Sequence, residues 1–233
     1  MRLVWLFDID GTLLHTDGAA REAFSRAVGA RFPDREPLGP VTFAGRVDPL
    51  ILRDILAHHG ASFGPREEAE FWEAVLEHMR RCLVPGRGHL LPGVTDVLSA
   101  VRAEPDWVCA LLTGNMTEMA GLKLGHYGLT DRFAFGAFGE EAPDRDALAR
   151  IAVERAWARY QVPADRCIVV GDTEHDIACA RAAGAHVVGV ATGVRSAAEL
   201  AVHEPDLLLE DLRDVDRLMT WARRIAATPA GRT

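Results

Sequence analysis

Cysteine is scarce in this 233-residue chain, and none of its cysteines are spaced as in zinc-binding or redox motifs. The four residues, Cys82, Cys109, Cys167 and Cys179, include no CxxC pair, which argues against a zinc ribbon or a thioredoxin-type centre. Cys109 and Cys167 lie inside apolar segments and are predicted to be small core residues. A reducing compartment, and hence a cytoplasmic location, is expected.

Long apolar runs and an excess of positive charge are also missing. The run Leu3–Phe7 ends at Asp8, which is too short for the core of a secretory signal, and no run approaches the roughly 20 residues of a membrane span. Lys and Arg total 26 against 34 Asp and Glu, giving a net charge of −8. We therefore expect neither nucleic acid nor membrane as a partner, but a small molecule. The oligomeric state, monomer or homodimer, stays open.

Short apolar runs separated by amphipathic stretches predict an α/β fold with a parallel sheet covered by helices. The runs are continuous rather than alternating, as expected for strands buried on both faces. They are Leu3–Phe7, Trp107–Leu112, Cys167–Val170, His186–Val190 and Leu207–Leu209.

Residues 16–90 interrupt this alternation and contain no convincing strand. Ile51, Leu52, Ile55 and Leu56 form one helical stripe, and a second runs through Phe71, Val75 and Met79. The sequence therefore predicts a core of residues 1–15 and 91–222, an all-helical insertion at 16–90, and a flexible tail at 223–233.

Three of the apolar runs lead directly into polar motifs. These are Asp8-Ile9-Asp10-Gly11-Thr12, Thr113-Gly114-Asn115 and Gly171-Asp172-Thr173-Glu174-His175-Asp176. Parallel strands end at one edge of a sheet, where open α/β sheets bind ligands. We therefore expect Asp8, Asp10, Thr113, Asp172 and Asp176 to meet there.

Four carboxylates in one pocket repel one another unless a cation is bound. The candidate ligands are all oxygens, which favours Mg²⁺ over zinc, and Mg²⁺ usually completes its shell with water and a substrate phosphate. The Thr113 hydroxyl and the approachable backbone N–H of Gly114 are suited to an anion. The pocket thus indicates phosphate chemistry.

The motifs DIDGTLL at 8–14, LLTGN at 111–115 and GDTEHD at 171–176 resemble three signature motifs of the haloacid dehalogenase superfamily, in that family's order. The resemblance covers the chain except its tail and implies a Rossmann-like core. The insertion at 16–90 is similar to the helical cap of phosphoglycolate phosphatase-like members.

The resemblance also implies a role for each motif residue. Asp8 would be the nucleophile, forming an aspartyl-phosphate, and Asp10 the general acid and base. Magnesium would be held by Asp8, the Asp10 backbone carbonyl and Asp172, with Asp176 ligating it or lying behind a ligand. Thr113, Gly114 and Asn115 would bind phosphate, and Gly11 would permit the tight turn after the strand.

One family motif departs from the pattern. Phosphatases of this group often carry a lysine in a KPxP segment, but Ala142 stands at that position. Arg145 is the nearest cation and is predicted to replace the lysine in catalysis and phosphate binding. The alternatives are an ordinary surface arginine at 145, which would weaken or inactivate the site, and Arg150 one turn further on.

Two residues near the insertion are candidates for substrate selection. Arg46 would pair with a substrate carboxylate or second phosphate, or else form a surface ion pair. His15 would line the entrance to the site.

The sequence thus predicts a magnesium-dependent phosphatase of small phosphorylated metabolites, with phosphoglycolate as the leading substrate by resemblance. The acid at Asp10 favours a phosphate ester over a haloacid, because a departing halide needs no proton. A sugar phosphomutase of the same fold and an inactive phosphate-binding module remain as alternatives.

Overall fold

The centre of the molecule is a six-stranded parallel sheet in the order β5-β4-β1-β6-β7-β8. The computed structural model describes residues 1–228. The predicted α/β fold is confirmed, and the five apolar runs are all strands. The strands of this sheet are β1 (Leu3–Phe7), β4 (Trp107–Leu112), β5 (Gly136–Ala137), β6 (Cys167–Gly171), β7 (His186–Val190) and β8 (Leu207–Leu209).

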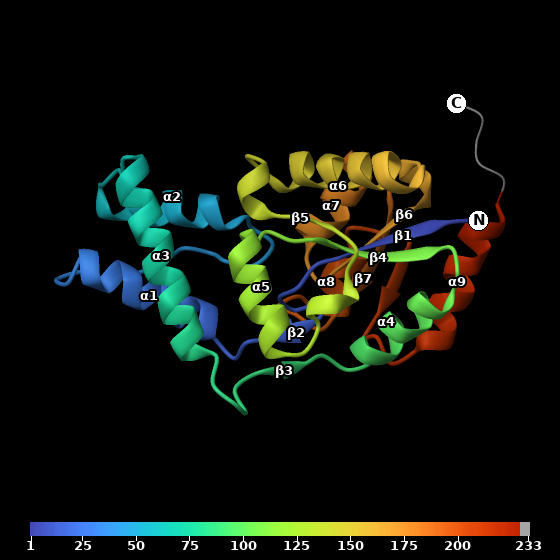
Figure 1. Ribbon diagram of the computed structural model, residues 1–233, viewed down its shortest axis with the longest axis horizontal. Helices are drawn as coiled ribbons and strands as arrows, with labels where there is room; N and C mark the ends of the chain where they lie inside the picture. Colours follow the sequence, from blue (N-terminus) through green and yellow to red (C-terminus); the bar gives the residue numbers. More distant parts are fainter. Residues whose placement is uncertain (229–233) are drawn as a thin grey trace.

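Helices cover both faces of this sheet (Figure 1). Side chains alternate along β1, so Leu3, Trp5 and Phe7 pack beneath one helical layer while Val4 and Leu6 pack beneath the other. The first layer contains α4 (Val94–Ala103), α5 (Thr117–His126) and α9 (Val215–Ala227). The second contains α6 (Arg145–Tyr160), α7 (Glu174–Ala182) and α8 (Ala197–Ala201). The strand is buried on both faces, which explains its unbroken apolar sequence.

Three helices between β1 and β4 lie to one side of the sheet (Figure 1). They are α1 (Ala19–Arg31), α2 (Asp48–His59) and α3 (Pro65–Cys82). They share a hydrophobic cluster that includes Phe24, Ile55 and Phe71, and Met119 of α5 joins it. We refer to residues 16–90 as the helical insertion.

Short strands bound the helical insertion, which the sequence did not indicate. β2 (Leu14–His15) pairs antiparallel with β3 (His89–Leu90), so the insertion is not entirely helical. Each strand has only two residues, too few for an alternating pattern to be recognisable. This two-stranded pairing joins the two chain segments that connect the insertion to the six-stranded sheet.

The predicted flexible tail begins too early. Helix α9 continues to Ala227, and Arg223 donates a hydrogen bond of 2.9 Å to Glu104. The apolar face that holds this helix against the sheet contains Leu218, Met219 and Ala222. Residues 229–233 of that predicted tail lie outside the described residues. Among residues 1–228, no helix combines the length and apolar character that a membrane crossing requires.

All four cysteines are buried with free thiols. Cys109 and Cys167 belong to the cores on opposite faces of the sheet, as predicted from the apolar runs around them.

Candidate active site

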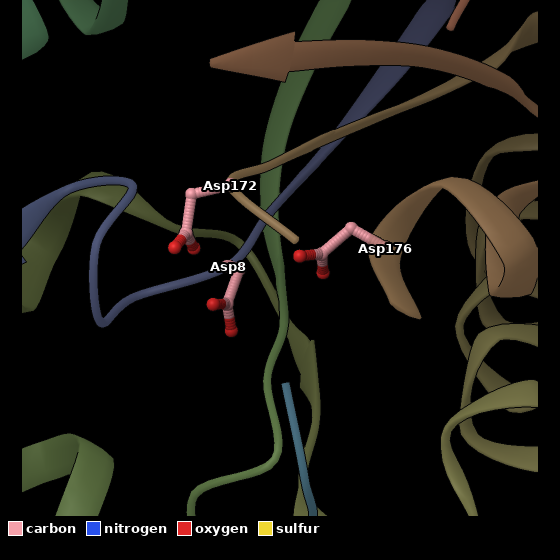
Figure 2. A group of neighbouring side chains, drawn as sticks. All are labelled: Asp8, Asp172 and Asp176. Atoms are coloured by element: carbon pink, nitrogen blue, oxygen red, sulfur yellow. The ribbon is translucent and has the colours of Figure 1, made fainter. Parts of the chain in front are cut away.

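Three carboxylates meet at the carboxyl end of the sheet, as Figure 2 shows. Asp8 follows β1, Asp172 follows β6, and Asp176 lies in the first turn of α7. One carboxylate oxygen from each lies within 4.8 Å of the others, and all three residues are buried. The parallel topology brings these residues together because β1 and β6 are hydrogen-bonded neighbours.

The turn after β1 requires a glycine beside this cluster. Gly11 adopts a φ of +80°, in the left-handed region, and a Cβ there would overlap the carboxylate of Asp172. The hydroxyl of Thr12 lies 3.2 Å from Asp172 Oδ1 and donates to it. The sequence Gly-Thr after Asp10 therefore both turns the chain and orients Asp172.

Asp176 has two roles in the structure. Its Oδ2 accepts hydrogen bonds from the backbone N–H and the hydroxyl of Thr173, at 3.0 and 2.7 Å, which closes the start of α7. Its Oδ1 pairs with the guanidinium of Arg145. Asp176 therefore closes the start of α7 and holds Arg145 within the carboxylate cluster.

Burial and mutual repulsion dominate the electrostatics of the cluster. Burial raises the pKa of Asp8 from 3.8 to about 6; Arg145 opposes the rise, and the charges of Asp176 and Asp10 add to it. Burial, followed by the charges of Asp176 and Asp8, raises the pKa of Asp172 well above its usual range. A divalent cation would offset this repulsion, and the oxygen-only donor set fits a hard ion such as Mg²⁺.

Arg145, the predicted replacement for the motif lysine, lies inside the cluster. It is the first residue of α6, which Asp144 caps by accepting a 2.8 Å hydrogen bond from the backbone N–H of Ala147. Its side chain is buried, with Nη2 3.2 Å from Asp8 Oδ1. Arg150 is exposed on the same helix. The geometry therefore supports Arg145, and not Arg150, as the cation beside Asp8.

The predicted phosphate-binding residues form a second network around Asp10. The side-chain amide of Asn115 donates to Asp10 Oδ2 and to Thr113 Oγ1, each at 2.8 Å. Thr113 is fully buried at the end of β4, and its hydroxyl oxygen also accepts from the backbone N–H of Asn115 at 3.3 Å. Asn115 thus connects the strand end to Asp10.

Sequence reasoning missed Lys123, the second buried cation of the site. It lies on α5, with Nζ 2.5 Å from Asp10 Oδ2 and 2.5 Å from Asn115 Oδ1. One signal was available: Lys123 is the only lysine of the 233 residues, against 25 arginines.

A cavity of about 310 Å³ connects the cluster to the helical insertion. Arg46 and His15, the two predicted selectivity residues, line it. The guanidinium of Arg46 pairs with Asp54 at 2.7 Å, and His15 Nε2 lies 2.9 Å from the carbonyl oxygen of Thr192. Four further lining residues were not predicted: Arg21, Phe24, Ile51 and Met119.

Asp48, which was not singled out as a site residue, attaches the helical insertion to the loop after β4. Its backbone N–H donates to the Gly114 carbonyl at 2.8 Å, and its Oδ2 accepts from the backbone N–H of Met116 at 2.9 Å. Burial raises the pKa of Asp48 to about 7, although Lys123 and the Met116 hydrogen bond lower it. Nothing in its local sequence distinguished it from a helix-capping acid.

Comparison with known proteins agrees with this geometry. The family model of haloacid dehalogenase-like hydrolases matches residues 4–184. A phosphoglycolate phosphatase of Cupriavidus necator is 30% identical over 224 residues, covering 94% of this chain and 93% of its own.

Two solved structures share the fold. A predicted phosphoglycolate phosphatase from Haemophilus somnus superposes with a TM-score of 0.75 at 20% identity, over 94% of this chain and 98% of its own. A β-phosphoglucomutase from Clostridium difficile superposes with a TM-score of 0.74 at 17% identity, over 98% and 100%. The family resemblance drawn from the three motifs is confirmed: the chain belongs to the haloacid dehalogenase-like hydrolase family, as a phosphatase-like enzyme.

Proposed function

We propose that the protein is a magnesium-dependent phosphomonoesterase that hydrolyses a small phosphorylated metabolite through an aspartyl-phosphate. The observation that carries the proposal is the position of Asp8, buried at the floor of the cavity with Arg145 3.2 Å away and two further carboxylates around it. Phosphoglycolate is the first substrate to test, because the 30%-identical relative is a phosphoglycolate phosphatase.

In the first step, a carboxylate oxygen of Asp8 forms a bond to phosphorus while the bond to the leaving alkoxide breaks. The carboxyl of Asp10 gives its proton to that alkoxide. Arg145 offsets the negative charge that the nucleophile and the phosphoryl oxygens bring together. Gly114 and Asn115 line the same cavity, and the buried Thr113 is hydrogen-bonded to Asn115. We assign these three residues to the phosphoryl oxygens.

In the second step, Asp10 takes a proton from water, and the water oxygen attacks phosphorus. The bond between phosphorus and Asp8 breaks, which releases inorganic phosphate and restores both carboxyl groups. The same residue serves as acid and then as base, so its carboxyl must stay in place through both steps.

Asp8, Asp172 and the backbone carbonyl of Asp10 would hold the magnesium ion, with Asp176 behind them. When bound, the ion supplies charge that reduces repulsion between the anionic nucleophile and the phosphate dianion. The carboxylates with raised pKa values are the residues that such a charge stabilises in their ionised form.

The helical insertion at 16–90 acts, in this proposal, as a cap over the core of 1–15 and 91–222. Closing it would exclude bulk water from the reaction. A cavity of about 310 Å³ suits a small metabolite. Arg46 and His15 line it and would contribute to selection, with Arg46 exchanging Asp54 for a substrate anion.

The test is hydrolysis of p-nitrophenyl phosphate and of a panel of small phosphate esters by the wild-type protein. We expect activity that EDTA removes, magnesium restores and Asp8→Asn abolishes. Trapping of a labelled phosphoryl group in wild-type protein but not in Asp8→Asn would identify the intermediate.

The same assay separates the two alternatives. A sugar phosphomutase would turn over only with a sugar bisphosphate present and would yield an isomer rather than free phosphate. An inactive binding module would bind magnesium and phosphate but release no product from any ester. Either result would overturn the proposal.

A further inference from the structure

Asp10 is held by two donors on one of its two oxygens. Oδ2 receives the amide N–H of Asn115 at 2.8 Å and the ammonium of Lys123 at 2.5 Å. Within the described part of the chain, no hydrogen bond is found to Oδ1. The Asp10 side chain is 43% exposed and faces the cavity, whereas that of Lys123 is 3% exposed.

Buried neighbours on α5 and a hydrogen bond to Asn115 hold Lys123 in place. It lies among the buried residues of α5, next to Leu124 and one turn from Met119 and Ala120. Its ammonium uses a second N–H on Asn115 Oδ1 at 2.5 Å. Since Asn115 also bonds Thr113 Oγ1, the two side chains connect Asp10 to the end of β4.

We propose that Lys123 is a positioning residue for Asp10. With Asn115, it fixes the carboxyl of Asp10 so that Oδ1 faces the leaving-group oxygen of the substrate. This inference rests on the proposed function, in which Asp10 is the general acid and base, and it names the residue that orients this acid.

The cost of burying an ammonium argues against a purely structural role. A buried ion pair adds little net stability compared with well-packed apolar side chains, so the apolar face of α5 would be as stable with a methionine at 123. The compact ammonium also contacts two oxygen atoms at once, and the larger planar guanidinium used elsewhere in the chain would match that spacing less well.

Lys123 and Arg145 have separate tasks in this arrangement. Arg145 contacts Asp8 and Asp176, on the nucleophile side of the site. Lys123 directs two of its three N–H groups at Asp10 and Asn115, on the leaving-group side. The rival role for Lys123 is direct binding of the phosphoryl group, and the two roles predict different kinetics.

The test compares Lys123→Met and Lys123→Arg on two kinds of phosphate ester. An alkyl phosphate needs a proton on its leaving oxygen, whereas p-nitrophenolate leaves without one. The ratio kcat/KM covers only the steps up to departure of the leaving group, so it isolates the acid role of Asp10. We expect Lys123→Met to lower kcat/KM for the alkyl ester by about 10²-fold, and at least tenfold more than for the aryl ester. Lys123→Arg should retain part of the kcat/KM for the alkyl ester that Lys123→Met loses.

An equal loss on both esters, with weaker competitive inhibition by inorganic phosphate, would assign Lys123 to phosphate binding and overturn the proposal. An equal loss without that change would assign it to structure and overturn it too. Arg155→Met is the control, because it removes a half-buried ion pair with Glu141 away from Asp10. If the wild-type protein hydrolyses neither ester, the proposed function fails, which is distinct from failure of the inference.

A second measurement does not depend on activity. Because the chain contains a single lysine, protein labelled with ¹⁵N-lysine gives one side-chain ammonium signal. We expect this signal to be protected from solvent exchange and to shift in Asn115→Ala. A rapidly exchanging ammonium that this substitution leaves unchanged would show that Lys123 does not hold the network.

Discussion

At the scale of single residues, burial determines which carboxyl groups respond to pH. Asp48 is 7% exposed, and its pKa is raised from 3.8 to about 7, chiefly by burial. The folded protein therefore binds a proton at Asp48 between about pH 4 and 7 that the unfolded chain releases. Stability from this residue is greatest below pH 4 and is lost as the pH rises through 7.

Asp48→Asn removes this titration and keeps an oxygen for the N–H of Met116. Because the wild type loses the contribution of Asp48 as the pH rises from 5 to 8, the difference in unfolding free energy between variant and wild type should shift by roughly 2 kcal/mol in favour of the variant. Urea unfolding of both proteins at the two pH values measures the change. If the two proteins differ in unfolding free energy by the same amount at both pH values, the prediction is contradicted.

Loss of Arg145 would leave two buried carboxylates without the cation that pairs with them. Without it, Asp8 and Asp176 face each other with no described cation between them. We expect Arg145→Ala to lower kcat/KM by about 10²-fold or more, and Arg145→Lys to recover part of it. Arg150→Ala, on the exposed side of α6, is the control and should behave as the wild type in steady-state assays.

At the scale of elements, the helical insertion touches the loop after β4 through backbone rather than long side chains. A Cβ on Gly114 would collide with the carbonyl of Arg46, and the Gly114 carbonyl accepts from Asp48 N. Such close packing fixes the insertion over the cavity.

Gly114→Ala would push the insertion away from the core while leaving the backbone N–H of residue 114 in place. We expect a loss of about 10²-fold in kcat/KM from the misplaced insertion, with faster proteolysis near Pro85–Pro92. Gly121→Ala is the matched control, because that helical position is open and the substitution should stabilise α5 by about 0.5–1 kcal/mol. Equal activity in the two variants would contradict a role for the contact.

The strands were predictable from sequence because they are buried on both faces, which leaves an unbroken apolar run. Strand β5 could not be predicted, because its two residues, Gly136–Ala137, form no apolar run. It pairs only with β4. Motif residues such as Asp172 could be found because they follow strands directly. Lys123, Asp48 and Arg21 could not, because each lies within a helix whose approach to the site depends on tertiary packing.

At the scale of the whole molecule, a cation bound at the carboxylate cluster would couple its binding to folding. Asp8 and Asp172 belong to segments more than 160 residues apart, so a cation held by both stabilises only the folded chain.

Magnesium at about 100 times its dissociation constant should therefore add roughly 2.7 kcal/mol to the unfolding free energy. This raises the melting temperature by about 5–10 °C for a chain of this size. The rise should be larger at pH 8 than at pH 5, because protons compete for Asp8 and Asp172, whose pKa values are raised. Thermal melts with magnesium or EDTA at matched ionic strength test this, and an equal rise in Asp172→Asn would rule out the cluster as the binding site.

The use of arginine in place of lysine across the surface has a practical consequence. Reagents that couple to lysine side chains find one target in the sequence, the Lys123 ammonium, and it is buried. Under native conditions, the surface side chains would therefore stay unlabelled by such reagents. A lysine introduced at one chosen surface position would then be the single reactive side chain, and a dye or a solid support could be attached there in one orientation.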